Sequence, residues 1–422
     1  MKKVAICFLI CLLCLVCGSS LADVALDKSN FPDDGFLDYL VSNGFDSDGD
    51  QILSDKELSE VTTIECTSCS IESLKGIEYF TSLKKLDCSD NNLTTLDISK
   101  NVALEELSVY RNQITALDIS GNTGLKWLYL NVNQLSSLDV SKNTALESLS
   151  LSYNPLGTLD VSNNTNLWQL ECNSCQLSSL DIGNNTALTY LNCGYNNLSS
   201  LNVSNNPALK RLTLSGNQVT SLDVSNNSCL YNLDLSENAV SALDLSNNPD
   251  LDTLFCSKCQ LSSLDVSGHE KLSRLSVDGN QLTSLDLRGC KSIRFLRCPN
   301  NQLRSLVISD CTQLESLDCH NNQLSSLDLS QNSVLQDIHC QSNQLTDLII
   351  GDESRLGQIW CSDNLLTELD ISHVRVELSE CVKNYSPRVD EQFGYGYGWW
   401  NSMYPDLSNY LFVDETVKVI TD

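Results

Sequence analysis

The chain has 422 residues, with 26 basic and 54 acidic side chains and a formal net charge of −28. Nucleic acids and anionic membrane surfaces are bound through basic side chains, so this charge balance argues against both as partners. Hydrophobic residues make up 41% of the chain, enough to build a packed core, which argues against disorder.

The first residues have the pattern of a secretory signal peptide. Two lysines precede an apolar run over residues 4–16, and Ser20-Leu21-Ala22 forms a small-x-small cleavage site. We expect residues 1–22 to be removed and the mature chain to be secreted or displayed at the cell surface. Lipoprotein anchoring at Cys17 is the alternative, although Val16 stands where a small residue is usual. The apolar run is too short to span a membrane, and no other segment is long and apolar enough.

Residues 23–61 are predicted to form a small helical cap that holds a calcium loop. The segment 46–57, DSDGDQILSDKE, fits the twelve-residue loop of an EF-hand, although Gln51 stands where glycine is expected. The expected role of Ca²⁺ is structural, locking the cap over the first repeat, and an acidic loop without metal is the alternative. The predicted ligands are Asp46, Asp48, Asp50, the backbone carbonyl of Ile52, Ser54 through a water molecule, and the carboxylate of Glu57.

Most of the remaining sequence repeats with a period of 21 residues. A leucine or isoleucine recurs at this spacing from Leu86 to Ile359, in fourteen consecutive units. Five positions later each unit has asparagine or cysteine, and seven positions later it has leucine, isoleucine or valine. This is the pattern of leucine-rich repeats. An earlier unit around Ile64 is one residue longer.

The period predicts an α/β leucine-rich-repeat solenoid over residues 62–376. Each unit is expected to be a short strand followed by an extended or 3₁₀ return, because 21 residues leave little room for a full helix. Stacked units form a curved, right-handed superhelix with a parallel sheet on its concave face and a mostly non-helical convex side. Recurrent Leu-Asp-Val/Ile triplets suggest a second short strand on the convex side. Residues 377–422 are predicted to cap the last unit.

An aspartate also recurs on the predicted convex side. Divalent-ion binding along the stack is one interpretation, and capping of the turns that follow is the other, which we favour. The residues are Asp97, Asp118, Asp139, Asp160, Asp181, Asp223, Asp244, Asp265, Asp286, Asp328 and Asp370.

Most of the cysteines follow the repeat. Nine occupy the inward position two residues after the leucine, and three replace the asparagine, which creates three C-x-x-C pairs beginning at Cys66, Cys172 and Cys256. Zinc or redox chemistry is one interpretation. We favour small buried core thiols, because both positions are core positions and the pairs lack a second pair or a nearby histidine. Cys290 and Cys311 are one unit apart and could approach disulfide distance.

Aromatic residues gather at outward positions of the predicted concave wall. Outward residues lie one before, one after and three after each leucine. Exposed aromatic side chains at this density mark a surface for partner recognition, because they bury a large area at low entropic cost. The predicted binding residues are Tyr110, Trp127, Tyr129, Trp168 and Tyr190. A weaker basic patch contains Arg274, Arg294 and Arg297, for which solvated charge is the plainer explanation.

Together these features resemble the internalin family of bacterial surface proteins, in particular its branch with 21-residue repeats and strand cysteines. The resemblance rests on the repeat, on Cys88, Cys319 and Cys340 within it, and on the entry segment 74–80, LKGIEYF. It covers nearly all of the mature chain and implies adhesion and binding of host proteins. The sequence departs from the family in lacking a cell-wall sorting motif, a hydrophobic tail and an immunoglobulin-like module.

We therefore expect an exported protein that binds macromolecules and is not an enzyme. No nucleophile elbow, phosphate loop or zinc-protease motif is present, although His320 and His339 are predicted on adjacent strands near Asp318. The leading hypothesis is an adhesin that binds an extracellular protein of a host or partner cell. A glycan-binding module and a purely structural envelope protein are the alternatives.

Overall fold

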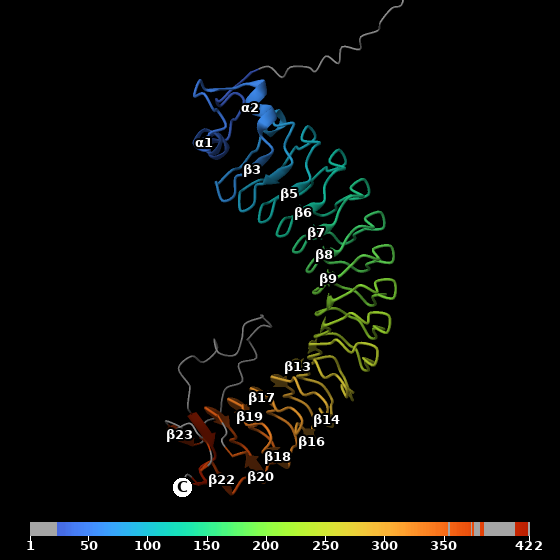
Figure 1. The fold of residues 1–422 in the computed structure, drawn as a ribbon, viewed down its shortest axis with the longest axis vertical. Helices are drawn as coiled ribbons and strands as arrows, with labels where there is room; N and C mark the ends of the chain where they lie inside the picture. Colours follow the sequence, from blue (N-terminus) through green and yellow to red (C-terminus); the bar gives the residue numbers. More distant parts are fainter. Residues whose placement is uncertain (1–22, 353–354, 373, 375–379, 384–409, 421–422) are drawn as a thin grey trace, which may run out of the picture.

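The computed structural model describes residues 23–352, 355–372, 374, 380–383 and 410–420 (Figure 1). The predicted signal peptide, with Cys17, and most of the predicted C-terminal cap lie outside these residues. The described chain is an arc of stacked units with strands along its inner side and a small helical cap at the N-terminal end (Figure 1). The predicted solenoid architecture is therefore confirmed.

The cap is a helix–loop–helix closed by a short ribbon. Helix α1 (Asp34–Ser42) begins where Asp33 accepts a hydrogen bond from the Phe36 N–H, and α2 (Asp55–Glu60) begins with a capping box. Strand β1 (Val24–Ala25) pairs antiparallel with β2 (Ile52–Leu53), which lies within the loop between the helices. The second oxygen of Asp33 accepts hydrogen bonds from two backbone N–H groups of the first unit, which fastens the cap to the solenoid.

One parallel sheet lines the concave side, and its strands pair with their leucine positions in register. Its strands from the N-terminal end are β3 (Thr63–Glu65), β4 (Lys85–Asp87), β5 (Glu106–Ser108), β6 (Trp127–Tyr129), β7 (Ser148–Ser150), β8 (Gln169–Glu171), β9 (Tyr190–Asn192), β10 (Arg211–Thr213), β11 (Asn232–Asp234), β12 (Thr253–Phe255), β13 (Arg274–Ser276), β15 (Phe295–Arg297), β17 (Ser316–Asp318), β19 (Asp337–His339), β21 (Gln358–Trp360), β24 (Tyr410–Val413) and β23 (Glu380–Lys383).

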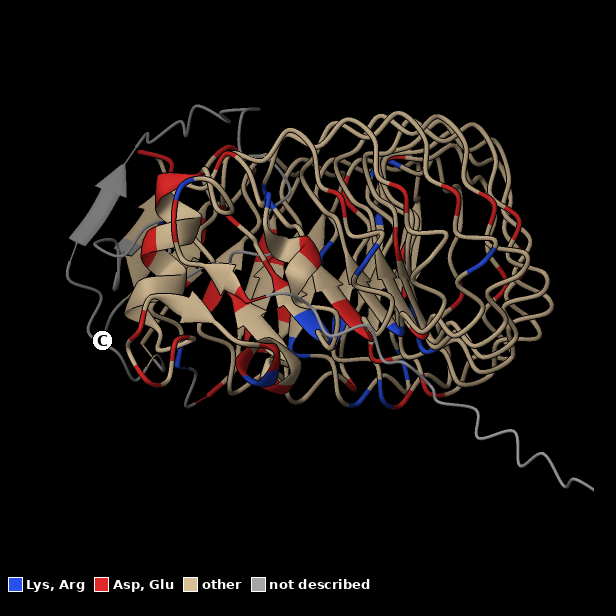
Figure 2. Cartoon of the chain, turned by 90° about the horizontal axis from the view of Figure 1, so that it is seen from above, with Lys and Arg blue, Asp and Glu red and all other residues tan. Residues whose placement is uncertain are grey.

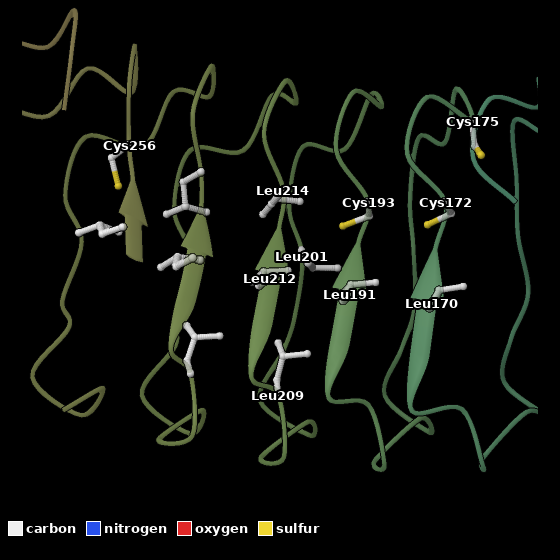
Figure 3. Packing of buried hydrophobic residues seen from close by; sticks show 14 of the residues in the cluster. Leu170, Cys172, Cys175, Leu191, Cys193, Leu201, Leu209, Leu212, Leu214 and Cys256 are labelled. Atoms are coloured by element: carbon white, nitrogen blue, oxygen red, sulfur yellow. The ribbon is translucent and has the colours of Figure 1, made fainter. Parts of the chain in front are cut away.

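The alternation of buried and exposed residues along each strand defines two outward rows. We call the residues immediately before the leucine positions the leading row, and those immediately after them the trailing row. The leucine itself is buried, as is the residue two positions later, because strand side chains alternate between faces. Each fully buried leucine contributes roughly 1.5–3 kcal/mol, and stacking the units joins these contributions into one core (Figure 3).

A buried asparagine bonds the backbone at the bend that follows each strand. Asn196 is representative: its Nδ2 donates to the carbonyls of Cys172 and Cys193 at 2.9 and 3.0 Å. Its Oδ1 accepts from the N–H groups of Cys175 and Leu177 at 3.0 Å each. One side chain thus ties together three segments of backbone that would otherwise be buried without partners.

A second column of buried asparagines, which sequence reasoning missed, occupies the opposite bend. In Asn164, for example, Nδ2 donates to the carbonyls of Val140 and Asn143 at 3.1 and 2.8 Å. His269, Cys290 and Cys311 replace the asparagine in three consecutive units. The asparagines of this column are Asn101, Asn122, Asn143, Asn164, Asn185, Asn206, Asn227, Asn248 and Asn332.

The convex side is extended, with one 3₁₀ turn, η1 (Ile77–Tyr79), before the first full unit. In the described chain, convex strands occur only in the C-terminal units, so the predicted second strand is present in part of the solenoid. They are β14 (Ser284–Asp286) with β16 (Ser305–Val307), β18 (Ser326–Leu329) with β20 (Asp347–Ile350), and β22 (Glu368–Asp370) with β25 (Lys418–Ile420). They begin in the unit that ends at Cys290.

The convex aspartates cap turns, as predicted. Asp160 accepts a hydrogen bond from the Ser162 N–H at 2.9 Å, and hydrogen bonding to Ser162 lowers the pKa of Asp160. All eleven predicted aspartates accept the N–H two residues ahead in this way. The column is therefore explained by backbone geometry without bound ions.

The segment 410–420 supplies one further unit at the C-terminal end of the arc. Strand β24 pairs with β21 so that Leu411 takes the leucine position opposite Ile359. The Asp414 carboxylate accepts hydrogen bonds from the N–H groups of Asp363 and Asn364, next to the preceding bend. Residues within the predicted cap therefore extend the sheet and cover the last buried layer.

We expect replacement of Asn196 by alanine to lower the free energy of unfolding by about 3 kcal/mol, because it leaves buried carbonyl and N–H groups unbonded. Asn197→Ala is the matched control, since the Asn197 side chain is exposed and makes only one 3.4 Å hydrogen bond. Urea unfolding followed by circular dichroism measures both. Equal midpoints for the two variants would contradict the role given to the buried asparagines.

Candidate partner-binding face and calcium loop

The structure places the five predicted aromatic residues on the N-terminal half of the concave face. Trp127 and Tyr129 are the two outward residues of β6, and Tyr190 opens β9 in the leading row. Trp168 comes immediately before β8, and Tyr110 lies two residues after β5. Trp168 and Tyr110 are 42% and 37% exposed, and the other three are half-buried.

These residues form two groups, one on β5 and β6 and one around β8 and β9. Tyr110 belongs to the first, since the N–H of the preceding Val109 donates a hydrogen bond to the Tyr129 carbonyl at 2.8 Å. Along the leading row, Ser148 and Gln169 separate Trp127 from Tyr190, a span of about 14 Å at the usual strand spacing. Trp168 and Tyr190 are neighbours, since the Trp168 carbonyl accepts a hydrogen bond from the Tyr190 N–H at 3.1 Å. Smaller outward side chains on β7 therefore lie between the aromatic residues of β6 and those around β8 and β9.

Sequence reasoning also missed the strand between these groups. The outward residues of β7 and its following turn are all serines, Ser148, Ser150 and Ser152, and each is buried. Beside them, the Glu171 carboxylate accepts hydrogen bonds from the Gln169 amide at 2.9 Å and from the Ser150 hydroxyl at 3.4 Å. The signal available in the sequence was the occurrence of serine at every second position from Ser148 to Ser152.

The C-terminal half of the concave face carries a buried ionic group. Asp318 is 2% exposed and lies 2.6 Å from Nδ1 of His320 and 3.7 Å from Arg297. Burial opposes ionisation of both residues, but their mutual hydrogen bond lowers the pKa of Asp318 and raises that of His320. On the next strand the His339 ring stacks on Trp360 at 5.2 Å. The two histidines are thus half-buried, and each contacts a neighbouring side chain of the concave face.

The predicted basic patch is largely neutralised. Arg294 pairs with Glu315 at 2.7 Å, and the guanidinium groups of Arg274 and Arg294 lie over the Phe295 ring at 5.6 and 5.5 Å. Acidic side chains are distributed along the whole arc and outnumber the basic ones (Figure 2). This arrangement favours the plainer explanation of the arginines over an acidic partner.

The predicted calcium loop brings three of its carboxylates together. Ligand atoms of Asp46, Asp48 and Asp50 lie within 4.8 Å of one another. Asp46 accepts hydrogen bonds from the N–H groups of Gly49 and Gln51 at 2.7 and 2.8 Å. Gln51 adopts a φ of 65°, the left-handed conformation for which glycine is usual, so the tight turn forms without glycine.

Glu57 lies outside this carboxylate group. Its carboxylate accepts hydrogen bonds from the N–H and hydroxyl groups of Ser47 and of Ser54, at 2.6 to 2.9 Å, and these lower the pKa of Glu57 to about 2. The backbone N–H of Asp50 donates a hydrogen bond to Asp48, which lowers the pKa of Asp48. The negative charges of Asp50, Glu57 and Asp46 outweigh this effect, so the pKa of Asp48 is raised. Three converging carboxylates suit a hard cation, and coordination by Glu57 would require exchange of its bonds to serine.

The repeat cysteines are free thiols of the core, as predicted. Cys172 and Cys193 lie at the same height immediately after β8 and β9, in the position that Leu214 occupies after β10 (Figure 3). Cys175 keeps one hydrogen bond of the asparagine that it replaces, since its thiol donates to the carbonyl of Leu151, 24 residues earlier, at 3.2 Å. Between Cys66 and Cys361, Cys229 is the exposed cysteine, Cys69 is half-buried and the others are buried. Cys290 and Cys311 are not joined by a disulfide, and their thiols donate to the carbonyls of Val266 and Leu287.

Stacked 21-residue units, a parallel concave sheet and bend asparagines define a leucine-rich-repeat protein. A family model described as At1g61320/AtMIF1, LRR domain, matches residues 250–369. The functional domain of InlJ from Listeria monocytogenes, which includes a cysteine ladder, superposes with a TM-score of 0.79 at 33% identity, covering 84% of this chain and 78% of that one. The chain belongs to the internalin family of bacterial leucine-rich-repeat proteins.

Two further comparisons mark the limits of this similarity. Internalin J of L. monocytogenes serotype 4b is 39% identical over 71 residues, which are 17% of this chain but only 8% of internalin J. The plant peptide hormone receptor RGFR1, in complex with RGF2, shares the fold with a TM-score of 0.58 at 21% identity, covering 75% of this chain and 64% of that one.

Among the described residues, no helix has the length and apolar character needed to cross a membrane.

We expect thiol reagents at pH 8 to label Cys229 rapidly and Cys193 only after unfolding. Burial raises the pKa of Cys193 to about 12, so at pH 8 it is a protonated, inaccessible thiol, and the thiolate is the reactive form. Mass spectrometry of digested, iodoacetamide-treated protein measures both sites, with labelling in guanidinium chloride as the control. Comparable labelling of both in the folded protein would contradict the buried ladder.

Proposed function

We propose that this protein is exported and acts as an adhesin, binding an extracellular protein of a host or neighbouring cell through the N-terminal half of its concave face. The observation that carries the proposal is the set of exposed and half-buried aromatic side chains on β6 and around β8 and β9. A short, rigid strand already holds these side chains, so little conformational entropy is lost when a partner covers them.

Membership of the internalin family supports a binding role, since its members are surface or secreted proteins. The fold is also used for protein recognition by the receptor RGFR1, which holds RGF2. Aromatic residues dominate the energetics of protein interfaces when they become fully covered. A glycan-binding module and a structural envelope protein are the alternatives, and the following experiment separates them.

The double variant Trp127→Ala/Trp168→Ala is expected to weaken retention of the partner at least about tenfold, because each removes an aromatic anchor. The mature chain, immobilised, is exposed to surface extracts of host and neighbouring cells and to a panel of soluble glycans. Val41→Ala/Val102→Ala, which trims two residues 60% and 58% exposed outside the concave face, is the control.

A protein retained by the parent and control chains but lost from the tryptophan variant supports the adhesin. Retention that is unaffected by the tryptophan substitutions refutes the proposed face. Loss of glycan retention alone favours the glycan-binding module, and the absence of any retained molecule favours the structural role.

We also propose that the loop 46–57 binds Ca²⁺ and stabilises the cap. The proximity of the Asp46, Asp48 and Asp50 carboxylates supports this, since a divalent cation would relieve the repulsion between them. The loop runs into α2, whose Leu58 is buried in the same core as the first repeat. Bound calcium would therefore brace the N-terminal end of the sheet.

Calcium at 100 times its dissociation constant is expected to stabilise the folded chain by about 2.7 kcal/mol relative to chelator. Asp48→Asn should abolish this response, whereas Asp38→Asn, which removes an exposed carboxylate on α1, should preserve it. Thermal unfolding in CaCl₂ and in EGTA gives the comparison. An unfolding temperature of the parent that does not change with calcium would refute the site.

A further inference from the structure

The outward residues of β7 and of the turn after it are the buried serines Ser148, Ser150 and Ser152, which we call the serine floor. Larger side chains of the neighbouring strands flank them on the concave face. Ser148 and Ser152 are 0% and 4% exposed, and within the described chain their hydroxyl oxygens have no hydrogen-bond partner. Ser148 pairs in register with Trp127 on one side, and Ser150 pairs with Tyr129. Buried hydroxyl groups without partners are costly, so a donor that reached these oxygens by displacing the covering side chains would be favoured.

Glu171 borders the same floor on its other side. In the trailing row it is two strands from Tyr129, about 10 Å along the sheet, with Ser150 between them. Both of its oxygens are oriented by neutral donors, Gln169 and Ser150, and among the described residues it forms no salt bridge. Its charge is thus held in place and is not neutralised by a neighbouring cation.

Around Glu171, the charged residues of the trailing row are all negative. From β3 to β12 the charged residues of the trailing row are all acidic, and the first basic one is Arg297 on β15. The Trp127 ring also already lies 5.7 Å from the Lys126 ammonium, which shows that its face can receive a cation. The charged residues of that stretch are Glu65, Asp87, Glu171 and Asp234.

We infer that the floor of β7 holds an arginine or lysine side chain of the partner, between the aromatic rings of β6 and the Glu171 carboxylate. The cation would be attracted by the ring faces on one side and form a charge-assisted hydrogen bond on the other, while the serine oxygens accept further donors. This inference rests on the proposed function, and it gives the partner a basic segment as its chemical class. A net charge of −28 attracts such a segment from a distance.

The test uses the full mature chain labelled with 5-fluorotryptophan and two blocked peptides, acetyl-Gly-Arg-Gly-amide and its citrulline counterpart. Citrulline has nearly the shape of arginine but no charge. The arginine peptide is expected to produce a saturable ¹⁹F shift of Trp127, assigned with Trp127→Phe, and the citrulline peptide to produce none. Glu171→Gln should weaken the arginine peptide about tenfold, the loss of one charge-assisted hydrogen bond.

Glu237→Gln is the matched control, because it removes the same charge from a turn three strands away. Affinity reduced by Glu171→Gln and preserved by Glu237→Gln supports the inference. Equal shifts from both peptides, no shift from either, or equal losses in both variants overturns it.

The outcome is independent of the test of the proposed function. If the tryptophan variant loses its protein partner while the arginine peptide produces no shift, the concave face binds proteins and the cation site is refuted. If the tryptophan variant keeps its partner, the proposed face itself is refuted, whatever the peptides do.

Discussion

The structure depends on satisfying the backbone at the two bends of every unit. A chain that turns back on itself every 21 residues carries carbonyl and N–H groups into a dry interior where the next strand cannot reach them. Buried asparagines solve this at both bends, and each one bonds carbonyls of its own unit or the previous one. Because these bonds join residues 24 and 21 apart, they hold the repeat length constant from unit to unit.

A constant repeat length has a direct effect on the concave face. It keeps the leucine positions in register, so the outward residues fall into straight rows whose members are one strand apart. Recognition can then be altered by single substitutions within a row, while the leucines and cysteines beneath remain unchanged. The contrast between the serines of β7 and the aromatic residues of β6 illustrates this, since both strands have a buried leucine at the equivalent position.

The period, the leucine positions, the buried thiols and the turn-capping aspartates were all predictable, because each follows from a residue type recurring at a fixed spacing. The second asparagine column recurs just as regularly, but a polar residue at a bend does not by itself reveal whether its side chain is buried. The grouping of Trp127, Tyr129, Trp168 and Tyr190 was harder, because row position does not reveal the size of the neighbours. The position of Glu57 depends on its hydrogen bonds to Ser47, which a motif does not specify.

The last unit also bears on how the molecule assembles. From β3 to β21 each concave strand joins one that lies 21 or 22 residues earlier, so units can add to a growing stack as the chain emerges. Strand β24 instead pairs with β21 across 52 residues, and the Asp363–Asp414 hydrogen bond next to it spans 51. Closing the longer loop costs more entropy, and contacts of greater sequence separation form more slowly. Completion of the C-terminal end should therefore be the late step of folding, reached after the N-terminal stack has already formed.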